Sequence, residues 1–327
     1  MKAFITGATG FLGSHLVDRL LEKGWEVHVL ARKSSNLRWL QGKNVKIFYG
    51  DVTGDRKGME EGLRGVDVCF HAAGIIRAPR REIYEQVNVE GARNLLETVL
   101  KVNPAIKKVI VVTSVAAHGP ARDDRPVTEE DSCHPVTDYG WSKLEEEKVA
   151  LQYKDRFPIT IIRPPAIYGP RDEQLLKYFK MVRRGILILP GEKGRQLNIA
   201  HVQDVVTGLI LAAENPNSNG ETFFIGDRRD YEWEDMGDLL IRALKKKVIK
   251  IRLIKPIVYL LGIVGELLTL ITGRSMPFGR ANMSNFIQKR WTLDISKARR
   301  ILGYEPAHPL KEGFDETAKW YRENGWV

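Results

Sequence analysis

Tyr139 and Lys143 form a pair of residues that could transfer a proton. On a helix, a spacing of four positions places both side chains on one face. A phenol with a pKa near ~10 is a poor base at neutral pH, but a neighbouring ammonium stabilises the phenolate and lowers that pKa. Because a tyrosine packed under a lysine stem is common by chance, this pair needs support from a third residue.

Ser114 is the candidate for that third residue. It follows an expected strand over residues 108–113. Ligands of a doubly wound sheet bind at the carboxyl ends of its parallel strands, so the Ser114 hydroxyl could hold a substrate oxygen while Tyr139 moves its proton. The three residues together predict proton transfer coupled to hydride transfer.

A glycine-rich stretch near the N-terminus could hold the pyrophosphate of a dinucleotide. Residues 6–13 read TGATGFLG, directly after an expected strand and at the start of a helix. The glycines let the backbone approach the phosphates, and the helix N-terminus favours their negative charge. A tight turn without a ligand is the alternative, but the position in a βαβ unit favours nucleotide binding. The predicted contacts are Gly7, Thr9, Gly10, Phe11, Leu12 and Gly13.

The residues after the second expected strand bear on which nicotinamide cofactor binds. An acid at this place accepts a hydrogen bond from the ribose of NAD, but this chain has Arg32 and Lys33 there. An arginine suits the 2′-phosphate of NADP, so NADP(H) is favoured and NAD(H) is the alternative. Further cofactor contacts are predicted at the ends of later strands, by Asp51, Val52, Ala72, Ala73, Gly74 and Thr113.

Seven short apolar or β-branched runs, separated by helical stretches, would position these residues. This pattern predicts an α/β fold with a Rossmann-type, doubly wound parallel sheet. The expected strands are residues 2–6, 26–31, 45–49, 66–71, 108–113, 159–163 and 221–225. A change to helices with irregular links after Arg163 predicts a smaller, mainly helical, discontinuous lobe. We assign residues 1–163 and 203–228 to the dinucleotide-binding domain, and residues 164–202 and 229–327 to a substrate-binding lobe.

Composition and charge exclude several classes of protein. Two cysteines, Cys69 and Cys133, predict neither a disulfide framework nor a metal site, and they favour a reducing compartment. The apolar run after Met1 is short and broken by glycines, which argues against a signal peptide and favours a cytoplasmic protein. The net charge of +10 comes with no nucleic-acid-binding module, so binding to nucleic acid is not expected.

Several longer motifs carry a resemblance to a known family. They are HAAG at 71–74, NVEGARNLLE from Asn88, TSVAAHG at 113–119, YGWSK at 139–143 and RPPAIYGPR at 163–171, with AHVQDV and DISKARRILGYEP further on. Together they resemble the extended short-chain dehydrogenase/reductase family, also called the NAD-dependent epimerase/dehydratase superfamily. The resemblance implies that Tyr139 is the acid/base, Lys143 binds the nicotinamide ribose, Ser114 binds substrate and Pro164 borders the nicotinamide. It also implies a homodimer.

Within this family, the sequence favours an apolar substrate over a sugar nucleotide. Sugar-nucleotide enzymes usually carry an Arg where this chain has Leu197, and often an Arg and an Asp where it has Ser284 and Ile287. The pattern is closest to 3β-hydroxysteroid dehydrogenase, dihydroflavonol reductase and hopanoid-associated members, which predicts a sterol-, terpenoid- or polyphenol-like alcohol or ketone. A nucleotide-sugar 4-epimerase or dehydratase stays open, because Arg195 or Arg290 could compensate. A non-enzymatic dinucleotide sensor is disfavoured, because it would not need Tyr139, Lys143 and Ser114 together.

A basic and then apolar segment, residues 242–272, is the last feature of the sequence. Seven basic residues and no acid occupy 242–255, and Glu266 is the only charge in 257–271. The apolar run is too short for a confident membrane span, so we predict a buried helix that covers the substrate cleft. A peripheral contact with an anionic membrane is the alternative. Its apolar residues are Ile257, Leu260, Leu261, Val264, Leu267, Leu268 and Ile271.

Overall fold

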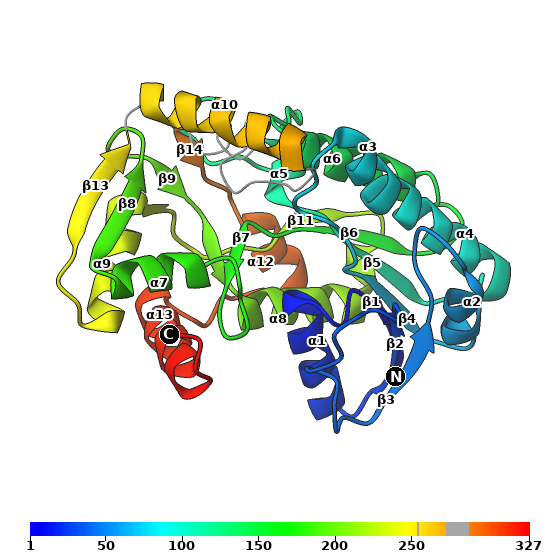
Figure 1. Ribbon diagram of the computed structural model, residues 1–327. Helices are drawn as coiled ribbons and strands as arrows, with labels where there is room; N and C mark the ends of the chain where they lie inside the picture. Colours follow the sequence, from blue (N-terminus) through cyan, green and yellow to red (C-terminus); the bar gives the residue numbers. More distant parts are fainter. Residues whose placement is uncertain (254, 273–287) are drawn as a thin grey trace.

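A parallel sheet of seven strands forms the centre of the molecule (Figure 1). The computed structural model describes residues 1–253, 255–272 and 288–327. The strand order is β11-β6-β5-β4-β1-β2-β3, and every neighbouring pair is parallel. The strands are β1 Lys2–Thr6, β2 Glu26–Ala31, β3 Val45–Tyr49, β4 Val68–His71, β5 Lys108–Val112, β6 Ile159–Arg163 and β11 Thr222–Phe224. The predicted fold class and all seven predicted strands are confirmed, with differences of one or two residues at some ends.

Helices cover both faces of this sheet, as the apolar strands require. Ala3 and Ile5 of β1 belong to one hydrophobic core, and Phe4 between them belongs to another. The first core is closed by α1, α8 and α12, and the second by α2, α4 and α6. The helices are α1 Phe11–Glu22, α2 Lys57–Leu63, α3 Arg81–Tyr84, η1 Glu85–Glu90, α4 Gly91–Val102, α5 Val115–His118, α6 Asp138–Leu151, α8 Val202–Glu214, η2 Pro216–Ser218 and α12 Ser296–Leu302.

A smaller lobe lies beside the sheet, to the left in Figure 1. Its helices α7 Leu176–Arg183, α9 Trp233–Leu244 and α13 Leu310–Glu323 surround a separate core that contains Phe179, Leu187, Leu240 and Phe314. Helix α10 Lys255–Thr272 also belongs to this lobe. Its strands, which the sequence analysis did not predict, are β7 Ala166–Tyr168, β8 Ile186–Pro190, β9 Gln196–Leu197, β10 Ile199–His201, β12 Tyr231–Glu232, β13 Ile249–Leu253 and β14 Arg290–Trp291.

The proposed domain boundaries stay a prediction. The return of the chain to the sheet through α8 and β11 agrees with the assignment of residues 203–228 to the dinucleotide-binding domain. However, α12, from the segment assigned to the lobe, contacts α8 and β11. The C-terminal part of the chain therefore contributes to both halves of the molecule.

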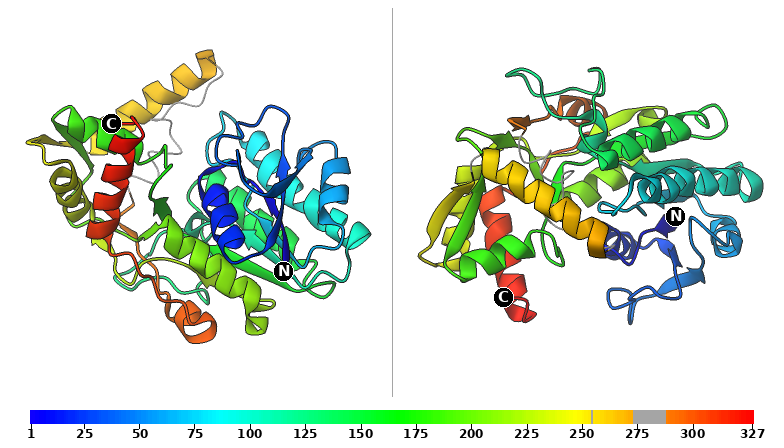
Figure 2. Two further views of the ribbon diagram at one scale, coloured as in Figure 1. Left: turned by 90° about the horizontal axis from the view of Figure 1, so that it is seen from below. Right: turned by 45° about the horizontal axis from the view of Figure 1, so that its top comes forward.

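Helix α10 differs from the buried helix that the sequence predicted. It runs across the top of the molecule from the end of β13 (Figures 1 and 2). Val258 is 2% exposed, but Leu260 is 61% exposed and Ile271 is 79% exposed. Val258, Gly262 and Gly265 are buried at helical spacing, so one stripe of the helix packs inward, whereas Ile257, Leu260, Ile263, Val264 and Ile271 are exposed. The prediction of burial is wrong for the outward side chains whose placement is described. The side chains of Leu261, Leu267 and Leu268 lie outside the described part of the structure. In the described part of the chain, no helix is long and apolar enough to cross a membrane.

Candidate active site

The structure brings Ser114, Tyr139 and Lys143 together at the carboxyl edge of the sheet. Ser114 follows β5 and caps α5, because the backbone N–H of Ala116 donates to its hydroxyl oxygen at 3.1 Å. Tyr139 and Lys143 lie one turn apart on α6. The Ser114 side chain is close enough to the Tyr139 phenol to lower the pKa of that phenol. The constellation that the sequence predicted is therefore present as a connected group, although the roles of its members stay predictions.

Opposing influences act on the Tyr139 phenol. Burial raises its pKa above the usual range, whereas the Lys143 ammonium and the Ser114 hydroxyl lower that pKa. The Tyr139 ring packs at 6.2 Å from the ring of Tyr84 and is still partly exposed to solvent. The phenol thus lies at the boundary of the protein with its proton in place, where a substrate oxygen could approach it.

Lys143 is fixed inside the protein, where its side chain is almost fully buried. Its ammonium donates to the carbonyl oxygen of Val112 at 3.1 Å and lies 2.7 Å from a carboxylate oxygen of Glu146. Burial alone would lower the pKa of Lys143, but Glu146 and Tyr139 outweigh that effect and raise its pKa above the usual range. Lys143 is therefore a cation held directly behind Tyr139.

The backbone around the glycine-rich turn has the shape that a dinucleotide requires. Gly7 has a positive φ of 76°, and a Cβ there would lie 2.5 Å from the carbonyl oxygen of Ala72. This contact joins the ends of β1 and β4, where the strand order reverses and ligands of this architecture bind. A Cβ at Gly74 would lie 3.1 Å from Nζ of Lys143. The residues present therefore fit a nicotinamide dinucleotide that passes from the glycine-rich turn to Lys143.

Within the glycine-rich turn, the residues differ in exposure. Gly10 is exposed at the start of α1, while Gly7, Thr9, Phe11 and Leu12 are partly exposed. Gly13 is buried, and a Cβ there would lie 2.2 Å from the carbonyl oxygen of Gly7. Gly13 thus allows α1 to approach the turn closely, whereas the other predicted residues keep surface that could contact a ligand.

The other predicted cofactor residues lie at the ends of their strands, with different surroundings. Arg32 and Lys33 are exposed after β2. Asp51 accepts hydrogen bonds from the backbone and hydroxyl of Thr53, both at 2.9 Å. Val52 and Pro164 are buried, and Ala72 and Ala73 are partly exposed.

Thr113, a predicted cofactor residue, has its side chain directed at Glu147. It is buried, and its hydroxyl donates to Oε1 of Glu147 at 2.7 Å. Arg163 donates to the same carboxylate at 2.8 and 2.6 Å. This buried group ties α6 to β5 and β6, and it therefore fixes the helix that carries Tyr139 and Lys143.

Sequence reasoning missed Glu146, Glu147 and His71. Glu146 and Glu147 follow Lys143 by three and four positions, and this helical spacing was the pattern that could have placed both acids on the face that carries Lys143. Asn88, the first residue of the NVEGARNLLE motif, anchors the backbone after β4: its side chain accepts from the backbone N–H of Ile75 at 2.8 Å and donates to the carbonyl oxygen of Ile75 at 3.1 Å.

The positions that bear on substrate choice lie in the lobe. Leu197 is buried in β9, within the core of the lobe. Arg195 is also buried and donates to the carbonyl oxygen of Gln288 at 3.2 Å, and Arg290 forms an ion pair with Asp124. Ser284 and Ile287 lie outside the described residues.

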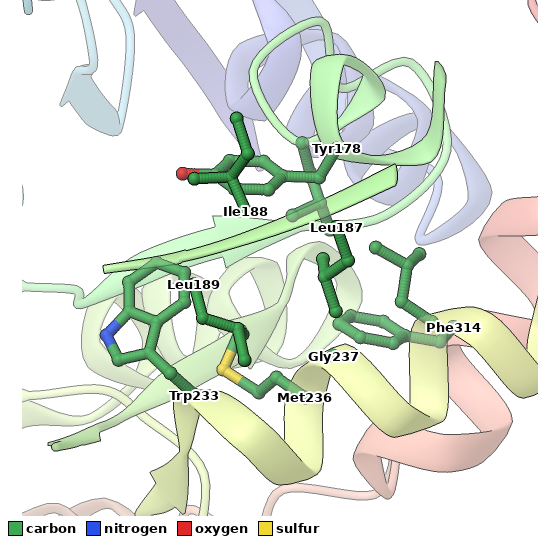
Figure 3. Close-up of a pocket in the computed structure, with 10 residues that line it drawn as sticks. Tyr178, Leu187, Ile188, Leu189, Trp233, Met236, Gly237 and Phe314 are labelled. Carbon is green, nitrogen blue, oxygen red and sulfur yellow. The ribbon is translucent and has the colours of Figure 1, made fainter. Parts of the chain in front are cut away.

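An apolar hollow lies inside the lobe (Figure 3). Leu187 and Leu189 of β8 face Met236 of α9 across it, with Tyr178 and Trp233 at its edge. None of the residues that line it is Ser114, Tyr139 or Lys143. This hollow therefore belongs to the packing of the lobe.

Comparison with known proteins identifies the family to which this chain belongs. A family model described as the NAD dependent epimerase/dehydratase family matches residues 3–226. A ceramide reductase of Caulobacter vibrioides is 30% identical over 99% of this chain and 95% of its own length. The 4-hydroxy-2-methyl-3-oxo-4-farnesyl-3,4-dihydroquinoline-1-oxide ketoreductase of Stigmatella aurantiaca is 28% identical over 96% of this chain and 95% of its own.

Other similar proteins act on sugar nucleotides. A UDP-glucose 4-epimerase of Vibrio cholerae is 26% identical over 96% of this chain and 94% of its own length. The crystal structure of a UDP-glucuronic acid 4-epimerase from Bacillus cereus in complex with NAD superposes with a TM-score of 0.80, at 22% identity and 99% coverage of both chains, which shows the shared fold. From the family match and these relatives, we conclude that the chain belongs to the NAD-dependent epimerase/dehydratase family and is an NAD-dependent enzyme of the extended short-chain dehydrogenase/reductase type.

Proposed function

We propose that this enzyme transfers hydride between a nicotinamide cofactor and a secondary alcohol or ketone of a largely apolar, lipid-like molecule. The observation that carries the proposal is the exposed apolar surface of α10, where Leu260 and Ile271 are 61% and 79% exposed. Leu197 adds support, because it is buried at a place where a sugar diphosphate would need a cation. The ceramide reductase and the farnesylated-quinoline ketoreductase, two of the similar proteins, are named for apolar substrates.

In this proposal each of the three residues has a separate task. The Ser114 hydroxyl, held after β5, orients the substrate oxygen. Tyr139 gives its proton to that oxygen during reduction and takes a proton from it during oxidation. Lys143, fixed by Val112 and Glu146, stabilises the phenolate that remains. A bound nicotinamide cofactor would supply or accept the hydride, with the turn at Gly7 holding its phosphates.

For the cofactor we propose NADP(H). Arg32 is exposed at the end of β2 and forms no ion pair with any described residue, so its guanidinium is free to meet a 2′-phosphate. An acid that would accept from the ribose of NAD is missing at this place. Dissociation constants for NADPH and NADH test this preference.

A nucleotide-sugar 4-epimerase is the second candidate. It is favoured by the similarity to the Vibrio cholerae enzyme and by Arg195, a buried cation in the lobe. The two candidates differ in net chemistry, because a reductase consumes one reduced cofactor per product and an epimerase consumes none.

The test is a panel of ketones assayed by the loss of NADPH or NADH absorbance. The panel contains a 3-oxosteroid, a 3-oxo-ceramide and a flavanone, and UDP-glucose binding is measured in parallel by calorimetry. We expect reduction of at least one apolar ketone and no micromolar binding of UDP-glucose. Micromolar binding that is lost in Arg195→Ala, with no ketone reduced, would support the epimerase instead.

We also propose that residues 242–272 contact an anionic membrane from which the substrate is drawn. Lys245, Lys246 and Lys247 are exposed, and they precede the outward apolar side chains of α10. Basic residues next to an exposed apolar helix suit the interface of an anionic bilayer.

Vesicle sedimentation tests this contact. The wild type should sediment with phosphatidylglycerol vesicles more than with phosphatidylcholine vesicles. The double variant Leu260→Ser, Ile271→Ser should lose this preference. Leu151→Ser is the matched control, because Leu151 is a leucine of α6 that is 38% exposed. Equal sedimentation of all variants would contradict the proposal.

A further inference from the structure

Glu146 is a buried carboxylate that the mechanism above uses only to fix Lys143. It is 0% exposed and lies three positions after Lys143 on α6. One carboxylate oxygen lies 2.7 Å from Nζ of Lys143, and the other lies 3.8 Å from Nε2 of His71. Burying a carboxylate is costly, and a small apolar residue could occupy the position without that cost.

Among its charged neighbours, Lys143 is the partner that balances the Glu146 charge. His71 is neutral, because burial lowers its pKa to about 3, and its other ring nitrogen lies 2.7 Å from the Thr6 hydroxyl. The adjacent Glu147 is balanced by Arg163 at 2.6 Å. Within the described residues, no backbone N–H or hydroxyl donates to Glu146. Its electrostatic effect is therefore directed at Lys143 and at the residue beside it.

We propose that Glu146 is a positioning residue that offsets the charge of Lys143 and so keeps Tyr139 protonated, which sets the site for proton donation to a ketone. This inference rests on the proposed function, because it assigns a preferred direction to that same chemistry. Burial, Lys143, Ser114 and Glu146 all influence the pKa of Tyr139. The Glu146 carboxylate raises that pKa. Tyr84 packs against the Tyr139 ring, and Asp138 begins the same helix.

The direction of the effect follows from which form of Tyr139 each reaction uses. Reduction needs the phenol, so its rate falls as pH rises through the Tyr139 pKa. Oxidation needs the phenolate, so its rate rises over the same range. Burial raises the pKa of Glu146 to about 7, so the carboxylate is charged at the higher pH at which Tyr139 loses its proton. A charged Glu146 therefore extends the pH range in which reduction proceeds.

The test is a pH titration of tyrosinate absorbance near ~295 nm in the protein loaded with NAD⁺ or NADP⁺. Subtracting the titration of Tyr139→Phe isolates the Tyr139 signal. In Glu146→Gln the midpoint should fall by on the order of one pH unit, since one nearby negative charge is lost. Glu146→Asp keeps the charge and should stay near the wild type. Glu145→Gln is the matched control, because Glu145 lies on the same helix with its side chain 45% exposed.

An unchanged midpoint in Glu146→Gln would overturn the proposal, and so would a rise, which would mean that the carboxylate acts only by keeping Lys143 charged. If Glu146→Gln does not fold, the same titration with Glu146→Ala decides. The measurement needs no substrate. Its failure is therefore distinguishable from a failure to find an apolar ketone that the enzyme reduces.

Discussion

At the scale of single residues, the chemistry depends on a tyrosine whose environment holds its proton and a lysine whose environment holds its charge. Burial raises the pKa of Tyr139, and Lys143 opposes that rise. Such opposed influences keep the phenol able both to give and to regain a proton. The two side chains therefore contribute differently, and substitutions should separate them.

Lys143→Met should weaken cofactor binding and also slow turnover. The methionine keeps an unbranched apolar stem but removes the cation that acts on Tyr139 and, in the proposed role, on the nicotinamide ribose. Fluorescence titration with NADPH and steady-state kinetics measure the two effects. Loss of turnover with unchanged cofactor affinity would show that Lys143 does not contribute to cofactor binding.

Arg32→Ala should weaken NADPH binding by about 1.5 to 3 kcal/mol, the range for a hydrogen bond to a charged group, and leave NADH binding almost unchanged. The reason is that only NADP carries the 2′-phosphate. Dissociation constants for both cofactors check this, with Lys33→Ala for comparison. Equal losses for the two cofactors, or a wild-type preference for NADH, would contradict the assignment.

At the scale of elements, α6 is held in register by a buried ion pair and a hydrogen bond of Glu147. Glu147 joins this helix to β6 through Arg163 and to the end of β5 through Thr113. The glycine-rich turn joins β1 to α1 by a contact that leaves no room for a side chain. These two junctions place the proton-transfer residues and the expected cofactor path relative to one another.

Glu147→Gln should lower the free energy of unfolding by about 3 to 5 kcal/mol, because it leaves the Arg163 guanidinium buried without its counter-ion. Urea denaturation measures this. Glu145→Gln removes a surface carboxylate whose side chain is 45% exposed and should cost at most about 1 kcal/mol. Similar losses for both variants would show that the buried pair does not hold α6.

Gly13→Ala should disrupt the turn, because a Cβ would lie 2.2 Å from the carbonyl oxygen of Gly7. NADPH affinity should fall by at least an order of magnitude. The control is Gly24→Ala, where no atom lies within 4 Å of the added Cβ, although a positive φ makes that change mildly destabilising by about 1 kcal/mol. An unchanged affinity in Gly13→Ala would show that this close approach is dispensable.

At the scale of the whole molecule, the sheet was predictable because most of its strands are buried on both faces and read as apolar runs, while the edge strand β3 is only partly buried. The motifs at its carboxyl edge were equally visible. Glu146 was not, because an acid inside a helix looks like a solvated residue until the packing places it beside Lys143. The exposure of α10 was not predictable either, because Leu260 and Val258 have similar hydrophobicity but face opposite environments.

The central claim is that net hydride transfer to an apolar ketone takes place with Tyr139 as the proton donor. Its most direct measurement uses reduced cofactor that carries deuterium at the transferred position, with product analysis by mass spectrometry. We predict one deuterium in the alcohol that the wild type forms from an apolar ketone. Tyr139→Phe should form no product but should still bind cofactor. Conversion of UDP-glucose to UDP-galactose with NAD⁺ alone, with no deuterium in any apolar product, would contradict it.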